Sequence, residues 1–332
     1  MRLPKFEYLE PEVISEAVSL MEKYRGQCSI LAGGTDLLVA MKQRRQMPKY
    51  VLSLGKISAL KQIREEAGII SIGPLVTLEE LVKSSLIQEK LPVLAQAAWE
   101  VGSPLLRTVA TIGGNICLDT RCSFYNQSKF WRGARPDCHK AGGVICHVTN
   151  KENVCYSTFS GDIAPALIAL NAEISLAGGG GNQLMPLVRF YTGAGRTPNL
   201  LIAGDNRVLV EIKVPLPAEG TRGSYRKYRL RESIDFPLVG LASLVTVDSG
   251  EGICRDARLV ISGVGSGPVE AIQTANKLIG KKLNPEIIAE AAETAAAEIH
   301  PVRTDRVAPQ YKKKIIRAMV SEVITELGGV TL

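Results

Sequence analysis

The chain has 332 residues, of which 45% are hydrophobic and 22% charged, the balance of a globular protein with one large domain or two ordinary ones. No apolar run approaches the roughly 20 residues of a membrane span, and the first residues lack the apolar segment of a signal peptide, so we expect a cytoplasmic protein. The formal net charge of +7 comes from residues 121–155 and 300–317. A nucleic-acid groove requires a broad basic face, so we expect no nucleic-acid binding and place Lys312, Lys313 and Lys314 on the solvated face of a C-terminal helix.

The first half of the chain alternates helix-like and strand-like segments. Thr77 followed by Glu80 predicts a capping box at the start of one helix. A run of glycines at residues 178–181 predicts a flexible loop. In chain order, the pattern predicts a helix at 11–24, strands at 29–31, 50–54 and 69–72, helices from 77 and at 92–101, a strand with a glycine turn at 111–116, a helix after Gly161, and strands at 172–176 and 207–214.

Pro215-Leu216-Pro217 marks the predicted boundary between two domains, residues 1–216 and 217–332. Beyond it, strand-like segments precede helical ones, an order that predicts an antiparallel sheet with helices on one face. The predicted strands are at 224–230, 238–247 and 257–261, and the predicted helices are at 269–278, 285–299 and 309–327.

Residues 118–156 differ from the rest, because they hold four cysteines and two histidines but little aliphatic sequence. A disulfide framework is unfavourable in a reducing cytosol, and the C-x2–4-C knuckles of structural zinc are lacking. Four thiolates that converge from an irregular loop suit an iron–sulfur cluster, and the local charge of +4 over residues 121–155 suits an anionic cluster. Zinc and four unrelated thiols stay open as alternatives. The cysteines are Cys122, Cys138, Cys146 and Cys155.

Two glycine loops are candidates for a nucleotide. Residues 32–36, Ala-Gly-Gly-Thr-Asp, match neither the G-x-G-x-x-G nor the G-x4-G-K-[ST] pattern. Paired glycines after a strand nevertheless expose successive backbone N–H groups, which suits a pyrophosphate, and Thr35 and Asp36 add a hydroxyl and a carboxylate. Residues 111–115 form a second such loop. Each loop alone is more often a tight turn, but two in one domain favour a dinucleotide.

Taken together, several segments resemble the flavin-contacting motifs of the FAD subunits of the xanthine dehydrogenase family. They are residues 32–37 (AGGTDL), 111–116 (TIGGNI) and 161–167 (GDIAPAL), and residues 225–235 are similar to that family's F-x-K-x-x-x-R-x-x-x-D element, with Tyr225 in place of phenylalanine. The resemblance implies an α+β fold. Its first part is a two-part FAD-binding domain of the vanillyl-alcohol-oxidase/PCMH type, and its second is a small domain of the CO-dehydrogenase flavoprotein type.

The same resemblance implies a cofactor site. The first loop would hold the FAD pyrophosphate, and Asp162 would lie close to the flavin. Lys227 would approach the isoalloxazine from the second domain, where its ammonium stabilises negative charge on reduced flavin. The residues implied to bind FAD are Leu31, Ala32, Gly33, Gly34, Thr35, Asp36, Leu37, Ala110, Thr111, Gly114, Asn115, Asp162, Leu209 and Lys227.

Ordinary members of that family lack the cysteine-rich insert, and here it resembles the insert of the 4-hydroxybenzoyl-CoA reductase beta subunit. This implies a [4Fe–4S] cluster, with Phe124, Tyr125 and Trp131 packed around it. Its ligands would be Cys122, Cys138, Cys146 and Cys155.

An electron-transfer role follows from the resemblance. Electrons from ferredoxin would pass through the [4Fe–4S] cluster and FAD to [2Fe–2S] centres on a small partner. They would end at a molybdopterin cofactor on a large partner, in a dimer of heterotrimers, and no catalytic residue is expected on this chain. Two alternatives remain. One is the flavin subunit of an oxidatively running molybdenum hydroxylase or dehydrogenase that uses NAD or another acceptor, and the other is a zinc-stabilised binding module.

Overall fold

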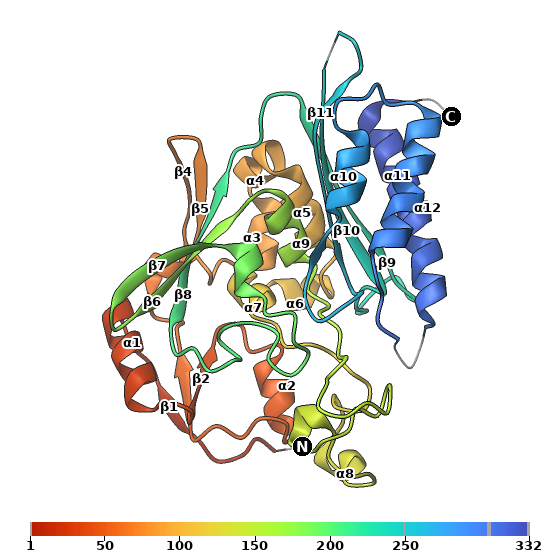
Figure 1. Cartoon of the computed structure of the whole chain (residues 1–332). Helices are drawn as coiled ribbons and strands as arrows, with labels where there is room; N and C mark the ends of the chain where they lie inside the picture. Colours follow the sequence, from red (N-terminus) through yellow and green to blue (C-terminus); the bar gives the residue numbers. More distant parts are fainter. Residues whose placement is uncertain (1, 249, 304–306, 331–332) are drawn as a thin grey trace.

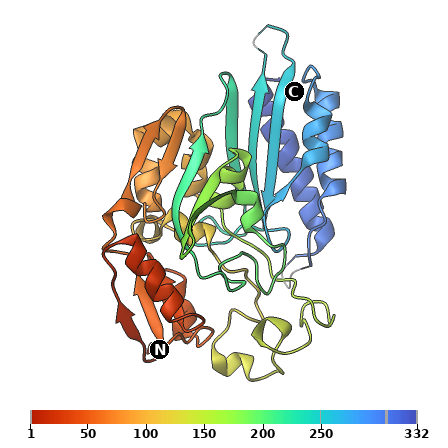
Figure 2. The same cartoon turned by 60° about the vertical axis from the view of Figure 1, so that its left-hand side comes forward.

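The computed structural model describes residues 2–248, 250–303 and 307–330, and within them it contains three β-sheets (Figures 1 and 2). Part of the predicted basic segment 300–317 therefore lies outside the described residues. No helix in these ranges is both long and apolar enough to cross a membrane.

A three-stranded parallel sheet with the order β1-β3-β2 forms the N-terminal part of the chain. The helix predicted at 11–24 is confirmed as α1, which packs Ala17, Val18 and Met21 against Leu52. The strands predicted at 29–31 and 50–54 are also confirmed, whereas β1 and α2 were not predicted. The bounds are β1 (Glu7–Leu9), α1 (Ile14–Lys23), β2 (Cys28–Leu31), α2 (Leu37–Lys42) and β3 (Tyr50–Ser53).

The next sheet is antiparallel, with five strands in the order β4-β5-β8-β6-β7. A single hydrophobic core joins it to α3, α4, α5 and α9. The predicted capping box is confirmed at α3, because the Thr77 N–H donates to Glu80 Oε2 at 2.7 Å and the Glu80 N–H donates to Thr77 Oγ1 at 3.2 Å. The bounds are β4 (Ile63–Glu66), β5 (Ile69–Ile72), α3 (Leu78–Lys83), α4 (Ser85–Lys90), α5 (Pro92–Trp99), α9 (Ile163–Ala169), β6 (Glu173–Gly178), β7 (Gly181–Pro186) and β8 (Val208–Pro215).

Two glycine segments differ from their predictions. The run 178–181 is a tight hairpin turn between β6 and β7 rather than a flexible loop, because Gly178 pairs with Gly181 and the φ of Gly181 is +100°. Residues 112–116 form a short helix rather than a strand, since Thr111 Oγ1 accepts the Gly114 N–H at 3.1 Å and caps its first turn. That helix is α7 (Ile112–Ile116), and other short helices are α6 (Pro104–Arg107), α8 (Lys129–Arg132), η1 (Ser58–Lys61), η2 (His139–Ala141) and η3 (Leu187–Phe190).

The C-terminal part is a four-stranded antiparallel sheet, as predicted, in the order β12-β11-β10-β9. Its helices cover one face, but the other face is buried as well, against α5 and α9 of the preceding part (Figure 1). Alternate residues of β10 show this, because Leu241 packs with the C-terminal helices and Ala242 with the first core. The bounds are β9 (Thr221–Tyr228), β10 (Val239–Val247), β11 (Cys254–Ser262), β12 (Val269–Glu270), α10 (Ile272–Leu278), α11 (Pro285–Glu298) and α12 (Pro309–Gly328).

Lys312 is a buried residue, which corrects its prediction as part of a solvated face. It lies one turn before Ile315 and Ile316, on the stripe of α12 that packs into the core. The residue is 1% exposed, and its Nζ donates a hydrogen bond to the Gly263 carbonyl at 2.6 Å. Burial lowers the pKa of Lys312 from 10.5 to about 8. Lys314, by contrast, is exposed as predicted.

The first prediction concerns this lysine and pH. The pKa of Lys312 is about 8 in the folded protein and 10.5 in the unfolded chain. Between these two pH values the unfolded chain therefore binds more protons than the folded protein. The free energy of unfolding should therefore rise by up to about 3 kcal/mol as the pH increases through this window. Lys312→Met should abolish that rise and stabilise the protein at neutral pH, whereas Lys314→Met should do neither. Urea unfolding followed by circular dichroism at several pH values measures this, and an unchanged pH profile in Lys312→Met would contradict it.

Candidate functional site

The first glycine loop joins the end of β2 at Leu31 to the start of α2 at Leu37. Within the described part of the chain, the backbone N–H groups of Gly33, Gly34 and Thr35 donate no hydrogen bond. Gly34 has a φ of +73°, which re-aims successive N–H groups and favours glycine. The loop therefore has free donors suited to a phosphate oxygen, and this is the observation by which the residues fit a dinucleotide.

The first loop packs directly on the segment before α7. A Cβ atom on Gly33 would lie 1.9 Å from the Val109 carbonyl oxygen, so a larger residue is excluded at this position. The neighbouring Ala110 carbonyl accepts the N–H of Leu78, at the start of α3, at 2.9 Å. The structure thus brings together the two loops that the sequence singled out.

The second loop in turn contacts the third motif. Asn115 Oδ1 accepts the Ile163 N–H at 3.1 Å, at the start of α9. Asp162 precedes this helix and is 3% exposed. Asn115 therefore sets the position of α9, and with it that of Asp162, relative to the glycine loops.

Asp162 is bonded to two side chains of β9. Its Oδ2 lies 3.0 Å from Lys227 Nζ, and its Oδ1 accepts the Tyr225 hydroxyl at 2.7 Å. Lys227 Nζ also donates to the Glu100 carbonyl at 2.9 Å. Burial raises the pKa of Asp162, although the Lys227 ammonium and the Tyr225 hydroxyl oppose the shift. This buried ion pair joins the third motif to the C-terminal part, and it includes both charged residues expected near the flavin.

Leu209 is the predicted FAD residue that lies apart from this series of contacts. It is 4% exposed, pairs with Leu176 across β6 and β8, and packs in the core of the five-stranded sheet. Its side chain therefore belongs to the hydrophobic core, and only its backbone could contact FAD.

The cysteine segment forms a lobe beside the two larger parts (Figure 2). All seven cysteines of the chain are free thiols, and the four predicted ligands line a single narrow pocket of about 10 Å³. No group of three or more His, Cys, Asp or Glu side chains in the described residues is arranged so that it could hold a metal ion. Convergence of four thiols is the feature by which the donor set fits an iron–sulfur cluster. They are Cys122, Cys138, Cys146 and Cys155.

The environments of these thiols are not alike. Burial raises the pKa of Cys122 to about 11. Burial also acts on Cys146, but hydrogen bonds from the backbone N–H groups of Tyr156 and Val148 bring its pKa below the ordinary value of 9.0. Backbone donors directed at sulfur stabilise the thiolate, which is the form that binds metal.

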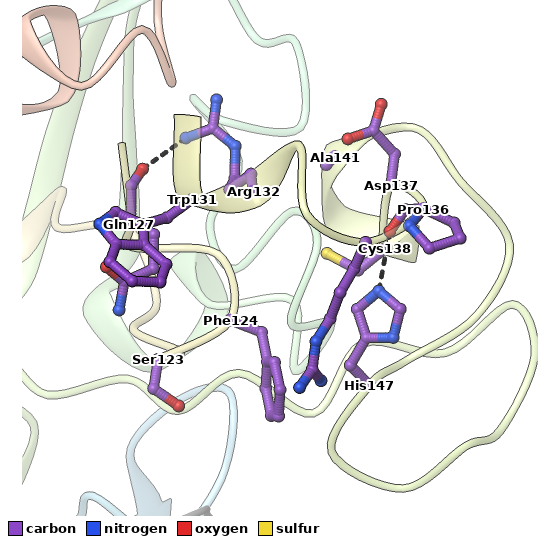
Figure 3. A pocket seen from close by; sticks show the side chains of 11 residues that line it. Ser123, Phe124, Gln127, Trp131, Arg132, Pro136, Asp137, Cys138, Ala141 and His147 are labelled. Carbon is purple, nitrogen blue, oxygen red and sulfur yellow. Dashed lines mark hydrogen bonds between the residues drawn. The ribbon is translucent and has the colours of Figure 1, made fainter. Parts of the chain in front are cut away.

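A second pocket, of about 330 Å³, opens on the surface of the lobe (Figure 3). Cys138 lines both pockets, so the thiol pocket adjoins the surface there. His147 fixes one wall, because its Nε2 lies 2.8 Å from the Pro136 carbonyl. Phe124 and Tyr125 line the thiol pocket as predicted, but Trp131 does not, since it is 67% exposed at the outer pocket. Helix α8 is too short to bury both faces.

Several polar residues of the site were not found from the sequence. The buried Lys140 Nζ donates to Asp119 Oδ1 at 2.7 Å and to the Gly195 carbonyl at 2.7 Å. The Ser157 hydroxyl donates to the same carbonyl at 2.8 Å and lies 3.1 Å from Cys155 Sγ. The one signal in the sequence was the position of Lys140 between two of the cysteines. Its partners could not be predicted, because Asp119 and Gly195 are distant from it in the sequence.

Comparisons with known proteins match this architecture. The family described as "FAD binding domain in molybdopterin dehydrogenase" matches residues 4–217, and "CO dehydrogenase flavoprotein C-terminal domain" matches residues 224–327. The carbon monoxide dehydrogenase medium chain of Hydrogenophaga pseudoflava is 29% identical over 97% of this chain and 96% of its own. The xanthine dehydrogenase FAD-binding subunit of Escherichia coli O157:H7 is 23% identical over 96% of this chain and 94% of its own.

A solved structure gives the same result. Carbon monoxide dehydrogenase from H. pseudoflava, in a form lacking the Mo-pyranopterin moiety, matches with a TM-score of 0.80 and 28% identity, over 97% of this chain and 96% of that chain. The chain therefore belongs to the FAD-binding proteins of the molybdopterin dehydrogenase family. It is an FAD-binding oxidoreductase subunit of the xanthine dehydrogenase and CO dehydrogenase group, and the predicted α+β fold is confirmed.

The second prediction concerns the buried ion pair. Lys227→Met leaves the Asp162 carboxylate buried without its cation, and this should lower the free energy of unfolding by about 3–5 kcal/mol at neutral pH. Arg226→Met on the same strand removes only an exposed pair with Glu326 and should cost less than about 1 kcal/mol. Urea unfolding compares the two, and Asp162→Asn combined with Lys227→Met should recover part of the loss. Equal losses in the two single variants would contradict the assignment.

The third prediction concerns the glycine loop. Gly33→Ala must displace the Val109 backbone and should weaken FAD binding by at least about tenfold, since the free N–H groups lose their alignment. Gly180→Ala is the matched control, because a Cβ there meets nothing within 4 Å. Flavin fluorescence titration of deflavinated protein measures both. Wild-type affinity in Gly33→Ala would remove the first loop from the FAD site.

Proposed function

We propose that this chain is an electron-transfer subunit that carries both FAD and a [4Fe–4S] cluster, in a molybdenum enzyme of the 4-hydroxybenzoyl-CoA reductase type. The observation that carries this proposal is the convergence of four cysteines, all from the insert at about 118–156, on one pocket. The cysteines lie in a lobe attached to the FAD-binding part, for which we propose the bounds 1–216. In the proposed complex, a large molybdopterin subunit and a small [2Fe–2S] subunit complete a dimer of heterotrimers.

The residues of this chain would serve these cofactors in distinct ways. The free N–H groups at Gly33–Thr35 would bind the pyrophosphate, and Cys122, Cys138, Cys146 and Cys155 would hold the cluster. When bound, FAD exchanges one or two electrons and the cluster exchanges one, so together they connect a one-electron donor such as ferredoxin to the partner centres. Lys227 would present its ammonium to the flavin in a fixed orientation, because Asp162 and the Glu100 carbonyl hold that ammonium in place.

The outer pocket supports a role for the lobe in electron exchange. Cys138 lies between the thiol pocket and the surface, so a cluster there would be close to solvent on one side. Arg132 lines that surface pocket and donates to the Gln127 carbonyl (Figure 3). Arg135 lines the same pocket together with one carboxylate, that of Asp137, and this net positive charge favours an acidic redox protein by electrostatic steering.

The second candidate is the flavin subunit of an oxidatively running molybdenum hydroxylase or dehydrogenase. The names of the relatives favour it, since two of them are a carbon monoxide dehydrogenase chain and a xanthine dehydrogenase subunit. The same cofactors on this chain would then pass electrons outward, to NAD or to another acceptor. An experiment can distinguish the two directions of electron flow, because only the first candidate is reduced by a low-potential ferredoxin faster than by NADH.

The fourth prediction tests the cofactor content. Anaerobically purified protein should contain one FAD and four iron and four sulfide per chain, and the reduced cluster should give an electron paramagnetic resonance signal. Cys138→Ser should abolish that signal and lower the iron content while the FAD content stays near one. Cys254→Ser is the matched control, since Cys254 is buried in the C-terminal part, and it should retain both cofactors.

Three results would contradict the proposal in different ways. Full iron content in Cys138→Ser would show that the ligand set is wrong. Stoichiometric zinc without iron would favour the zinc-stabilised binding module. Iron–sulfur signals in the absence of any bound flavin would separate the cysteine lobe from the electron path.

A further inference from the structure

Arg121 lies at the base of the cysteine lobe, where the chain leaves the FAD-binding part. Its N–H donates to the Thr158 carbonyl at 2.7 Å, and the Thr158 N–H donates back to the Arg121 carbonyl at 3.0 Å. The chain therefore enters and exits the lobe, residues 122–157, at one backbone bridge between Arg121 and Thr158. Cys122 follows Arg121 directly, and its N–H donates to Asn126 Oδ1 at 2.8 Å. A shift of Arg121 thus moves a proposed cluster ligand.

The side chain of Arg121 extends to the other cofactor site. Its guanidinium forms an ion pair with Asp36, the last residue of the first glycine loop. On the C-terminal part, the ring of Phe236 lies 4.8 Å from the same guanidinium. The two side chains of the ion pair are only 21% and 30% exposed, so solvent screens the pair less than it screens a surface pair. Three parts of the molecule meet at this one residue.

Charge around Asp36 is not balanced. Arg45 lies in the same electrostatic environment, because the lowering of the Arg45 pKa by burial is opposed by the Asp36 carboxylate and increased by the Arg121 guanidinium. Arg45 Nη2 and Arg121 Nε are both buried and lack a hydrogen-bond partner within the described residues. The Asp119 carboxylate also acts on Arg45 but is paired with Lys140. The two guanidinium groups therefore exceed the Asp36 carboxylate by one positive charge, between a loop suited to a pyrophosphate and a pocket lined by thiols. Both cofactors proposed for these sites are anionic.

We propose that Arg121 is a positioning residue that couples the two cofactor sites of this chain. Through its ion pair with Asp36, FAD bound at the first loop holds Cys122 in place for the cluster, and the assembled lobe holds Asp36 in place for FAD. This inference rests on the proposed function, because it requires both cofactors. Coupling of this kind is reciprocal, and a typical value is about 5- to 150-fold in affinity.

The fifth prediction uses a thermodynamic cycle on the whole chain. The FAD dissociation constant is measured anaerobically by flavin fluorescence for the wild type, Cys138→Ser, Arg121→Gln and the double variant. Loss of the cluster in Cys138→Ser should weaken FAD binding about tenfold, whereas the same loss in an Arg121→Gln background should change it less than about twofold. Reciprocally, FAD should slow cluster loss to a chelator in the wild type but not in Arg121→Gln.

Two further variants make the test specific. Arg135→Gln is the matched control, since Arg135 is an exposed arginine of the same lobe. Its guanidinium lies 5.1 Å from the Phe124 ring within the lobe and does not contact Asp36, so this variant should retain the full coupling. Arg121→Lys keeps the charge opposite Asp36 but loses the planar contact with Phe236, so it should retain part of the coupling. If Arg121→Gln binds neither cofactor, Arg121→Lys serves as the test: partial coupling supports the role of Arg121, and full coupling contradicts it.

The outcomes distinguish this inference from the proposed function. Equal FAD affinity with and without the cluster in the wild type would overturn the coupling, while the iron and flavin contents would still support the two-cofactor subunit. Full coupling in Arg121→Gln would overturn the role of Arg121. Wild-type protein that contains FAD but no iron would overturn the proposed function, and the coupling with it.

Discussion

The buried pair of Asp162 and Lys227 is the interaction on which the arrangement of the two larger parts depends. A carboxylate at 3% exposure is stable only when its charge is compensated, and the compensating ammonium comes from a strand of the other part, at 3.0 Å. The Tyr225 hydroxyl satisfies the second carboxylate oxygen. Because these groups must all be present together, the C-terminal sheet has one position relative to α9. The ion pair therefore fixes β9 relative to Asp162 and, through the Asn115–Ile163 hydrogen bond, relative to the second glycine loop.

Regular elements with strong periodicity were predictable from the sequence, and the reason is local. The capping box at Thr77 and the apolar spacing of α12 are both contained within a few residues, so no distant contact is needed to recognise them. Predictions went wrong where a distant contact decides the outcome. Lys312 looks like a surface residue until α12 meets the loop at Gly263. The turn at 178–181 was missed for a local reason, because strand β7, which pairs with β6 from Gly181 onward, was not predicted.

The candidate site shows the same division. The glycine loops and the cysteines were recognisable by residue type, because free N–H groups and thiols are specific donors. Their mutual placement was not, since Gly33 meets Val109 and Arg121 meets Asp36 across long separations in sequence. Polar residues that support the thiols, such as Ser157, carry no signal in the sequence at all. Serine is a common surface residue, and only its position 3.1 Å from Cys155 Sγ gives it a role.

The bridge between Arg121 and Thr158 has a consequence for how such a protein arises. Because the two ends of the cysteine lobe are joined by paired backbone hydrogen bonds, a short turn in place of residues 122–157 leaves the neighbouring strands and helices where they are. The lobe therefore has the geometry of an insertion, because both of its ends lie at one backbone bridge. A protein of this fold can gain or lose residues between these two points without a change in the spacing of its core.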